Sequence, residues 1–573
     1  MKSTTTPPDH KARLIIVGAA MMLLGCWLAY ATQTAGGIRI QDVRFTGTNG
    51  TGMSGLLYIP PNATAETPAP GVLAVHGYFN SREAQDGFAI EFARRGYVVL
   101  ALDQTGHGYS QPPAFANAFG GIDGLKYLRS LDIVDRENIG LEGHSMGGWT
   151  VVNAAAALPH GYKAMVLEGS STGAPFAPEG NETFPRNLAV VFSRYDEFPG
   201  IMWGVNKASN VVNSEKLKKV FGINEAVDPG HIYGSLDKGT ARVLYTPGGT
   251  HPMDHINPVA IGHSLDWFQK TLNGGTSRPS DDQIWYWKEF GTLIALIGFV
   301  VFLLGVFGQL LMLPLFAPLS ARHETSLDKR DARWWAAFSL GAFIPALTFL
   351  PFCRIGGELL PATPFLSQQF SSEVAFWAVL NAVIIMILTR LQGAGKAWPQ
   401  AQPIRAAVLA LTIFAIAYNV VAMADFLFEV DFRIWFLAFK VMSHAQTAAF
   451  IVYLIPFTFF FVITLRSLHS VLAVRTDSAF LQYLTNIAAL ASGFLLFLII
   501  QYGLLFSGHD PLLFHMFDPL RLIISINLVP LMVFVAVVST FAYRRTGHYL
   551  PGAFVCALFV TWYMVVGQAT QGG

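Results

Sequence analysis

The second half of this chain is a succession of long apolar runs, and these runs limit the folds that the chain can adopt. Eight of them follow residue 285, and each is long enough to cross a bilayer as a helix. They are centred near Phe299, Phe343, Ile384, Ile416, Leu454, Phe494, Leu531 and Val560. The whole chain is 52% hydrophobic and only 13% charged, which is too apolar for a soluble protein of 573 residues. The sequence therefore predicts an all-α polytopic membrane domain of about eight transmembrane helices over residues 276–573.

Basic residues between the apolar runs set the expected orientation of this domain. Retained positive charge marks the cytoplasmic side of a membrane, and every second connection is basic. A further apolar run at residues 14–32 follows Lys11 and Arg13 and predicts an N-terminal signal anchor over residues 1–37, with a cleaved signal peptide as the alternative. Residues 38–275 are then expected outside a bacterial cytoplasmic membrane. The basic connections carry Arg322, Lys329, Arg330 and Arg333, then Arg390, Lys396 and Arg405, then Arg466 and Arg475, then Arg544 and Arg545.

The charge balance excludes nucleic acid as an expected partner. The chain has 38 basic and 37 acidic residues, for a net charge of +1, so it offers no electrostatic attraction for a polyanion. Membrane lipid is the partner that the apolar runs imply. The three cysteines, Cys26, Cys353 and Cys556, lie in or beside those runs, so no disulfide is expected in the polar region.

Residues 38–275 have a different sequence pattern, in which short β-branched runs alternate with helical stretches. This alternation predicts the α/β class, with a doubly wound, mostly parallel sheet. Residues 199–240 form a longer connection, which is expected to carry short helices and to act as a lid. Strands are expected at residues 54–59, 71–75, 97–102, 138–141, 164–167, 188–192 and 242–245, and helices at residues 83–94, 121–129, 147–157 and 258–271.

One stretch of this region, Gly-His-Ser-Met-Gly at residues 143–147, indicates chemistry. It follows a predicted strand and precedes a helix of small residues, so Ser145 is expected at a sharp turn where Gly143 and Gly147 avoid a collision. A hydroxyl is a poor nucleophile at neutral pH, so the turn requires an imidazole base and donors for an oxyanion. The segment resembles the nucleophile elbow of the α/β-hydrolase superfamily, within its dienelactone-hydrolase-like and acyl-esterase-like groups.

The resemblance implies which residues complete the site around Ser145. Asp196 follows the strand at residues 188–192 and has the position of the family's acid, with Glu197 as the runner-up and Glu168 as a more distant alternative. The strand that ends in His-Gly at residues 76 and 77 implies the backbone N–H of Tyr78 as an oxyanion donor, together with that of Met146.

The Pro-Gly-x-x-His turn at residues 247–251 resembles the turn that carries the family's histidine, so His251 is the expected general base. His255 and His263 are alternatives. His251 and His255 could also share a face with Asp254 and bind a metal, but that arrangement leaves Ser145 without a role, so neither a metal nor a cofactor is expected. The Asp-x-x-Gly-His-Gly-x-Ser stretch at residues 103–110 also resembles the family, and its His107 is expected to be structural.

These features imply a membrane-anchored, extracytoplasmic serine hydrolase that cleaves a carboxylic ester, thioester or amide through an acyl-enzyme. The expected substrate is a small-molecule or lipid-like acyl compound. Two alternatives stay open: a serine peptidase on the same scaffold, and a transporter or sensor whose hydrolase-like domain binds a ligand without turnover. Neither the acyl group nor the oligomeric state follows from the sequence.

Overall fold

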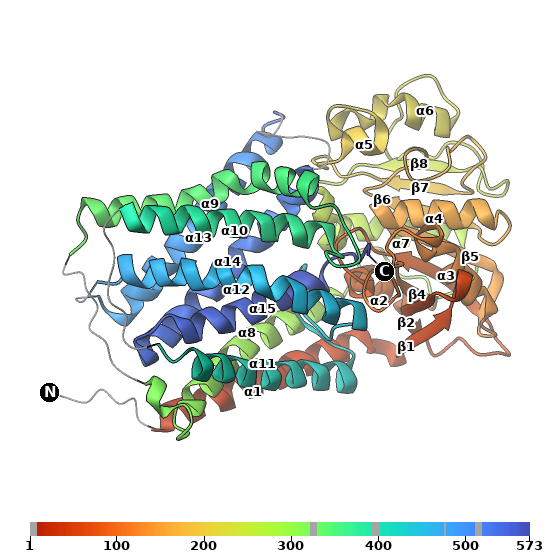
Figure 1. Ribbon diagram of the computed structural model, residues 1–573. Coiled ribbons are helices and arrows are strands. Elements are labelled where there is room, and N and C mark those ends of the chain that lie inside the picture. The colour runs from red at the N-terminus through yellow and green to blue at the C-terminus, as the bar shows by residue number, and fades with distance from the viewer. Residues whose placement is uncertain (1–7, 321–328, 392–400, 475–476, 510–517, 573) are drawn as a thin grey trace. The chain divides into compact units, whose positions relative to one another are not determined.

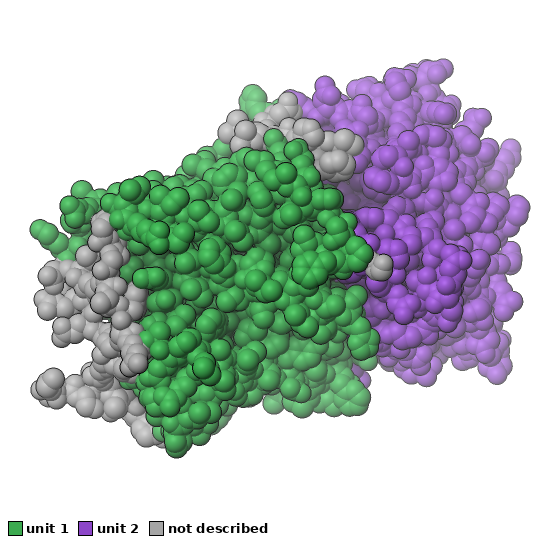
Figure 2. Space-filling model, viewed as in Figure 1, with its two compact units in different colours: residues 1–27, 291–566 green, residues 28–290, 567–573 purple. Residues whose placement is uncertain are grey.

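The chain folds into two units, one built on a β-sheet and the other on long helices (Figures 1 and 2). The computed structural model describes residues 8–320, 329–391, 401–474, 477–509 and 518–572. Residues 1–27 and 291–566 form unit 1, and residues 28–290 and 567–573 form unit 2. Arg322, Lys396 and Arg475, which contributed to the predicted orientation, lie outside the described residues.

Unit 2 is built on an eight-stranded sheet with the order β1-β2-β4-β3-β5-β6-β7-β8 (Figure 1). Neighbouring strands from β4 through β3 to β8 are parallel, while β2 runs antiparallel to both β1 and β4. The predicted α/β class with a mostly parallel sheet is therefore confirmed. The strands are β1 (Arg39–Thr46), β2 (Gly52–Ile59), β3 (Ala69–Val75), β4 (Val98–Asp103), β5 (Val134–His144), β6 (Ala164–Glu168), β7 (Leu188–Val191) and β8 (Arg242–Tyr245).

The sequence analysis did not predict β1. This edge strand pairs with β2 over its whole length, from Arg39 opposite Ile59 to Thr46 opposite Gly52. None of its residues is buried. An exposed edge strand needs no buried apolar run, so the hydrophobic pattern that revealed the other strands is missing here.

Helices cover both faces of the sheet. On one face, α2 (Asp86–Arg94) and α7 (Pro258–Thr271) bury aromatic side chains in a core that also contains Val72 and Ala74 of β3. Successive residues of a strand point to opposite faces. On the other face, α3 (Gly121–Ser130) approaches so closely that a Cβ at Gly124 would lie 3.2 Å from Leu73. The fourth helix, α4 (Met146–Ala157), contacts α3.

The connection between β7 and β8 contains the short helices α5 (Pro199–Trp203) and α6 (Glu215–Phe221). Lys216 links them, because its Nζ donates to the carbonyl of Met202 at 2.9 Å. Trp203, the last residue of α5, is buried. The predicted helices of this connection are present, and its role as a lid stays a prediction.

Unit 1 consists mainly of long apolar helices, together with a two-stranded antiparallel sheet of β9 (Phe432–Ile434) and β10 (Leu437–Phe439). All eight predicted centres of the apolar runs lie within α8 to α15, one in each helix. By length and composition, eight helices among the described residues could cross a membrane, namely α1 and α8 to α14, while α15 has 17 residues and is shorter. The helices are α1 (Pro8–Gln33), α8 (Tyr286–Leu310), α9 (Ala332–Leu359), α10 (Gln369–Leu391), α11 (Pro403–Phe428), α12 (His444–Val471), α13 (Ala479–Phe506), α14 (Asp518–Thr546) and α15 (Leu550–Val566).

Unit 2 extends beyond the predicted boundary at residue 275. Residues 276–290 group with the sheet because they are tied to α2: Lys288 forms an ion pair with Asp86 at 2.6 Å, and Asp282 pairs with Arg94 at 2.9 Å. Residues 567–573 also group with unit 2. The chain therefore passes between the two units after residues 27, 290 and 566.

A carboxylic acid is buried in the central strand β5. Glu142 lies opposite Ala74 of β3 and Val166 of β6, and both of these belong to the apolar core. Neither carboxyl oxygen of Glu142 has a hydrogen-bond partner among the described residues. Burial raises the pKa of Glu142 well above its ordinary value of 4.5.

We expect the substitution Glu142→Gln to stabilise unit 2 at alkaline pH. The folded-state pKa of Glu142 lies above the unfolded value, so the unfolded chain releases this proton first and the acid destabilises the fold increasingly as pH rises above 4.5. A neutral amide avoids that cost. Thermal unfolding followed by tryptophan fluorescence should show a midpoint higher by about 2–4 °C near pH 8, with the difference shrinking toward about pH 5.

Glu137 provides the matched control for this measurement, because it lies on the same strand with a side chain that is 84% exposed. The variant Glu137→Gln should show no difference that depends on pH. An equal gain for Glu142→Gln at both pH values would contradict the burial argument.

Candidate active site

Ser145 lies between β5 and α4 in a strained turn. Its φ of 56° and ψ of −122° are unusual for any residue other than glycine. Its N–H donates to the carbonyl of Glu168 at 2.9 Å, and its carbonyl accepts from the Gly148 N–H at 2.9 Å and from the Ser170 hydroxyl at 2.6 Å. These bonds hold the turn in place, and they leave Ser145 partly exposed between two buried neighbours.

Glycines allow the elements around this turn to approach one another closely. A Cβ at Gly147 would lie 2.0 Å from the carbonyl oxygen of Val75, and a Cβ at Gly143 would lie 2.3 Å from that of Gly147. Both positions therefore require glycine, as the elbow predicts. Gly77 brings the loop after β3 against the elbow, because a Cβ there would lie 3.2 Å from the Cβ of Ser145.

Asp196 and His251 meet beyond the ends of β7 and β8. The Nδ1 atom of His251 lies 2.7 Å from a carboxyl oxygen of Asp196, so the imidazole donates this proton and keeps Nε2 as an acceptor. The other carboxyl oxygen of Asp196 accepts from the Phe198 N–H at 2.7 Å. The imidazole also packs on Gly169, where a Cβ would lie 2.9 Å from its Nδ1. Gly169 directly follows Glu168, whose carbonyl accepts from the N–H of Ser145.

Burial sets the protonation of this pair. It lowers the pKa of His251 to about 3, so the imidazole is uncharged at neutral pH. It also raises the pKa of Asp196, and the N–H of Phe198 opposes that shift. An uncharged imidazole with a free acceptor nitrogen is the form that can take a proton from a hydroxyl.

The backbone of His251 is fixed by two further side chains. Glu197, the runner-up for the acid, accepts from the His251 N–H at 2.7 Å rather than from the ring. His144 donates from Nε2 to the His251 carbonyl at 2.9 Å, and the two rings lie 4.6 Å apart. The sequence analysis did not assign a role to His144. Its place directly before Ser145 was visible, but its partner lies more than a hundred residues away.

The alternative histidines have other surroundings. The ring of His255 lies 4.0 Å from that of His144 and packs on the edge of Phe88. His263 lies on α7, where it stacks on Tyr245 with ring centres 4.0 Å apart. Both rings therefore belong to packed parts of unit 2.

Hydroxyl groups hold two other carboxylates, that of Glu168, the distant alternative for the acid, and that of Asp254, which the metal hypothesis included. Glu168 accepts from the Ser264 hydroxyl, and Asp254 accepts from the Ser193 hydroxyl. Burial raises the pKa of both carboxyl groups. The charge of Asp254 raises the pKa of Glu168 further, and the charges of Asp196 and Glu197 raise that of Asp254. No group of three or more His, Cys, Asp or Glu side chains within the described ranges is arranged to hold a metal ion.

Tyr78 and Met146, the predicted oxyanion donors, lie at the start of a loop and of a helix. Met146 is the first residue of α4, so its N–H has no acceptor within the helix. The carbonyl of Tyr78 accepts from Nε2 of His107 at 2.7 Å. Burial lowers the pKa of His107 to about 3, so this histidine is a neutral donor, in agreement with its predicted structural role.

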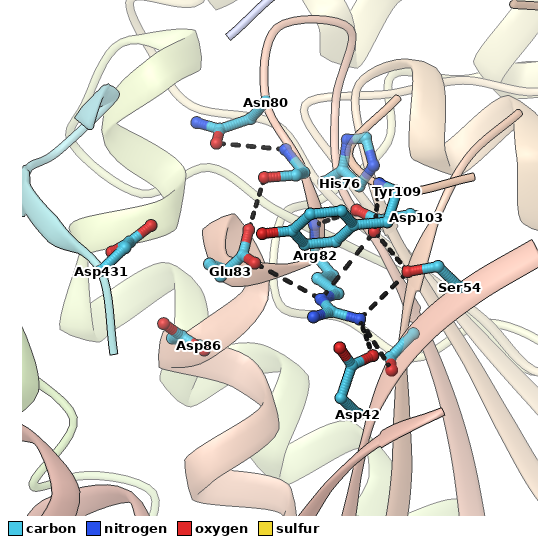
Figure 3. A network of polar contacts seen from close by, with 12 residues as sticks. Asp42, Ser54, His76, Asn80, Arg82, Glu83, Asp86, Asp103, Tyr109 and Asp431 are labelled. Atoms are coloured by element: carbon cyan, nitrogen blue, oxygen red, sulfur yellow. Dashed lines mark hydrogen bonds and ion pairs between the residues drawn. The ribbon is translucent and has the colours of Figure 1, made fainter. Parts of the chain in front are cut away.

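A buried charge network anchors the loop that carries Tyr78 (Figure 3). The guanidinium of Arg82 donates to Asp42 at 2.6 Å, to the Ser54 hydroxyl at 3.0 Å and to the Gly55 carbonyl at 3.1 Å. Its backbone N–H donates to Asp103 at 2.8 Å. The loop between β3 and α2 is thus tied to β1, β2 and β4. The sequence analysis used Asp103 only as evidence of the fold and did not single out Arg82.

A family profile and several relatives match parts of this chain. A family profile described as alpha/beta hydrolase fold matches residues 70–200, a range that contains Ser145 and Asp196. The chain is 37% identical over 89 residues to a 2-hydroxy-6-oxononadienedioate/2-hydroxy-6-oxononatrienedioate hydrolase of Cupriavidus pinatubonensis, covering 15% of this chain and 31% of that protein. It is 27% identical over 206 residues to a monoacylglycerol lipase of Mycolicibacterium smegmatis, covering 35% of this chain and 70% of the lipase.

A further curated protein and a solved structure are also similar to part of the chain. A protein of Mycobacterium phage D29 that carries the name non-heme haloperoxidase is 34% identical over 111 residues, which is 19% of this chain and 39% of that protein. The chain thus spans less than two fifths of the length of the phage and Cupriavidus proteins. Among solved structures, an esterase from Pyrococcus furiosus has a TM-score of 0.30 at 16% identity, covering 41% of this chain and 92% of the esterase.

The family match falls on the parallel sheet, and the glycine-lined turn at Ser145 has the strand–turn–helix form of that family. Unit 2 therefore has the α/β-hydrolase fold.

Proposed function

We propose that unit 2 is a serine hydrolase that cleaves a carboxylic ester, thioester or amide through an acyl-enzyme. The observation that carries this proposal is the 2.7 Å hydrogen bond between Asp196 and His251, made beside the strained turn of Ser145. Such strain is stored where function requires it, and a ligand-binding domain needs neither a strained serine nor a buried, oriented imidazole.

In the proposed reaction the Ser145 hydroxyl attacks the substrate carbonyl while Nε2 of His251 takes its proton. The backbone N–H groups of Tyr78 and Met146 stabilise the oxyanion of the tetrahedral intermediate. Asp196 stabilises the imidazolium, which then protonates the leaving group as the acyl-enzyme forms. Water, activated by the same imidazole, attacks the acyl-enzyme and releases the acid.

A lipid-like ester is the substrate class that we favour. The monoacylglycerol lipase that shares 27% identity with this chain supports an ester. The eight helices long and apolar enough to cross a membrane support a substrate that partitions into the bilayer, because the hydrolase would meet such a substrate at high local concentration. A screen of p-nitrophenyl esters of increasing chain length beside aminoacyl amides separates this class from a peptidase.

We expect a fluorophosphonate probe to label the wild-type chain at Ser145. The substitution Ser145→Ala should abolish labelling, and His251→Ala should slow it by at least about 1,000-fold, because the hydroxyl then lacks its base. The measurement is the rate of covalent labelling of folded protein, followed by mass spectrometry of the labelled peptide.

Ser130→Ala serves as the control, because Ser130 is an exposed serine at the end of α3. It should label at the wild-type rate. Absence of labelling in the folded wild type, or equal labelling of Ser145→Ala, would reject the enzyme and favour a ligand-binding domain.

The two neighbouring carboxylates should respond differently to amide substitution. Asp196→Asn should lower kcat for p-nitrophenyl butyrate by about 1,000- to 10,000-fold, because an amide at this place favours the wrong tautomer of His251. Glu197→Gln keeps an oxygen that can accept from the His251 N–H, so its loss should stay below about tenfold. If Glu197→Gln lost as much activity as Asp196→Asn, the role of the acid would pass to Glu197.

We also propose that unit 2 lies on the extracytoplasmic side, as the basic connections of the sequence favour. A cysteine introduced by Glu137→Cys lies on an exposed side chain, while the three native cysteines are buried. A membrane-impermeant maleimide should therefore label this variant in intact cells and leave the native chain unlabelled. Labelling of Glu137→Cys only after lysis would place unit 2 in the cytoplasm.

A further inference from the structure

The segment that follows α15 packs against the loops of unit 2. Thr570 forms two backbone hydrogen bonds there: its N–H donates to the Gly106 carbonyl at 2.8 Å, and its carbonyl accepts from the Ala114 N–H at 2.8 Å. The next residue, Gln571, donates from Nε2 to the hydroxyl of Tyr78 at 2.9 Å. All of these residues belong to unit 2. The segment thus contacts the residue that we assign to the oxyanion hole.

The loop after β4 is shaped to receive this segment. Gly106 has a φ of 71°, and a Cβ there would lie 2.6 Å from the carbonyl oxygen of Thr570. Ala569 and Thr570 are buried, with 1% and 3% of their surface exposed. The glycine of the Asp-x-x-Gly-His-Gly stretch therefore leaves the space that the backbone of Thr570 occupies.

Tyr78 is held from several directions. Its carbonyl accepts from His107, and its ring stacks on Phe115 with centres 5.6 Å apart and packs edge-on against Phe79. The bond from Gln571 fixes the far end of the same side chain. Oxyanion donors act only when they are aimed at the place where charge develops, so small displacements of this residue affect the rate.

Building on the proposed hydrolase function, we propose that Gln571 is a positioning residue for the oxyanion hole. By holding the Tyr78 hydroxyl, it fixes the loop from which the Tyr78 backbone N–H reaches the developing oxyanion. Residues that follow the last helix of unit 1 thereby complete the catalytic face of unit 2. Because the oxyanion exists only in the transition state and intermediate, the contribution of Gln571 falls on kcat rather than on KM.

A double-mutant cycle in the full-length protein tests this inference. With p-nitrophenyl butyrate as the probe, Gln571→Ala should lower kcat by about 3- to 10-fold and leave KM within about twofold. Tyr78→Phe removes the same hydrogen bond and should have a similar effect. The double variant should lose no more than either single variant, because both break one interaction.

Two further variants guard against a purely structural explanation. Gln269→Ala is the matched control, because Gln269 also donates from Nε2 to a protein oxygen, the Arg278 carbonyl at 2.9 Å, but lies on α7. It should leave kcat unchanged. Gln571→Glu should recover most of the lost activity, since the Tyr78 hydroxyl can donate to the new carboxylate.

Additive losses in the cycle, a change in KM alone, or a lowered thermal midpoint with unchanged kcat would each overturn the positioning role. A higher kcat in Gln571→Ala would also overturn it and identify the segment as a block over the site. Fluorophosphonate titration of the same samples distinguishes a failure of the proposed serine hydrolase from a failure of the proposed role of Gln571. An unlabelled wild type denies the serine hydrolase, whereas a labelled wild type with an equally active Gln571→Ala denies only the role of Gln571.

Discussion

The close approach of β3, β5 and α4 is the constraint on which the site depends. The chain can reverse from strand to helix at Ser145 only because Gly143 and Gly147 present no Cβ to the neighbouring backbone. The reversal places Ser145 at the end of β5, and β7 and β8 end at the same edge because they run parallel to it. Asp196 and His251 reach this edge from segments distant in the sequence, and their hydrogen bond forms there.

The sequence predicted the parts of this arrangement whose signal lies within a short stretch of the chain. A buried strand has a continuous apolar run, so the strands from β2 to β8 could be found, and so could the glycines around Ser145. The exposed edge strand β1 carries no such signal. The roles of Glu197 and His144 could not be predicted, because each contacts the backbone of His251, and only the folded chain brings that backbone within reach. The same holds for Arg82, whose partners come from three strands.

Burial keeps the histidines near the site uncharged, whereas the buried arginine stays charged. The histidines are kept neutral, since burial lowers the pKa of His251 and His107 to about 3. A neutral base is useful, and a neutral His107 can still donate to the Tyr78 carbonyl. Arg82 is charged but fully surrounded by acceptors, so its burial ties the loop rather than leaving an unpaired charge. The loop that carries Tyr78 is therefore stabilised by hydrogen bonds to a neutral imidazole and by a compensated cation.

Unit 2 extends beyond residue 275, the boundary that the sequence predicted for the hydrolase domain. Lys288, at the start of α8, forms a buried ion pair with Asp86, and the hydroxyl of Tyr58 donates to the same carboxylate at 2.6 Å. Glu91 accepts from the N–H groups of Ile284 and Trp285 at 2.6 and 3.1 Å. Removing one partner of a buried ion pair costs about 3–5 kcal/mol, so a chain cut at residue 275 would leave Asp86 of α2 without its cation. The start of α8 and the segment that follows α15 both supply contacts inside unit 2. The apolar helices α8 and α15 are thus joined to a domain whose interior depends on residues at the start of α8 and after the end of α15.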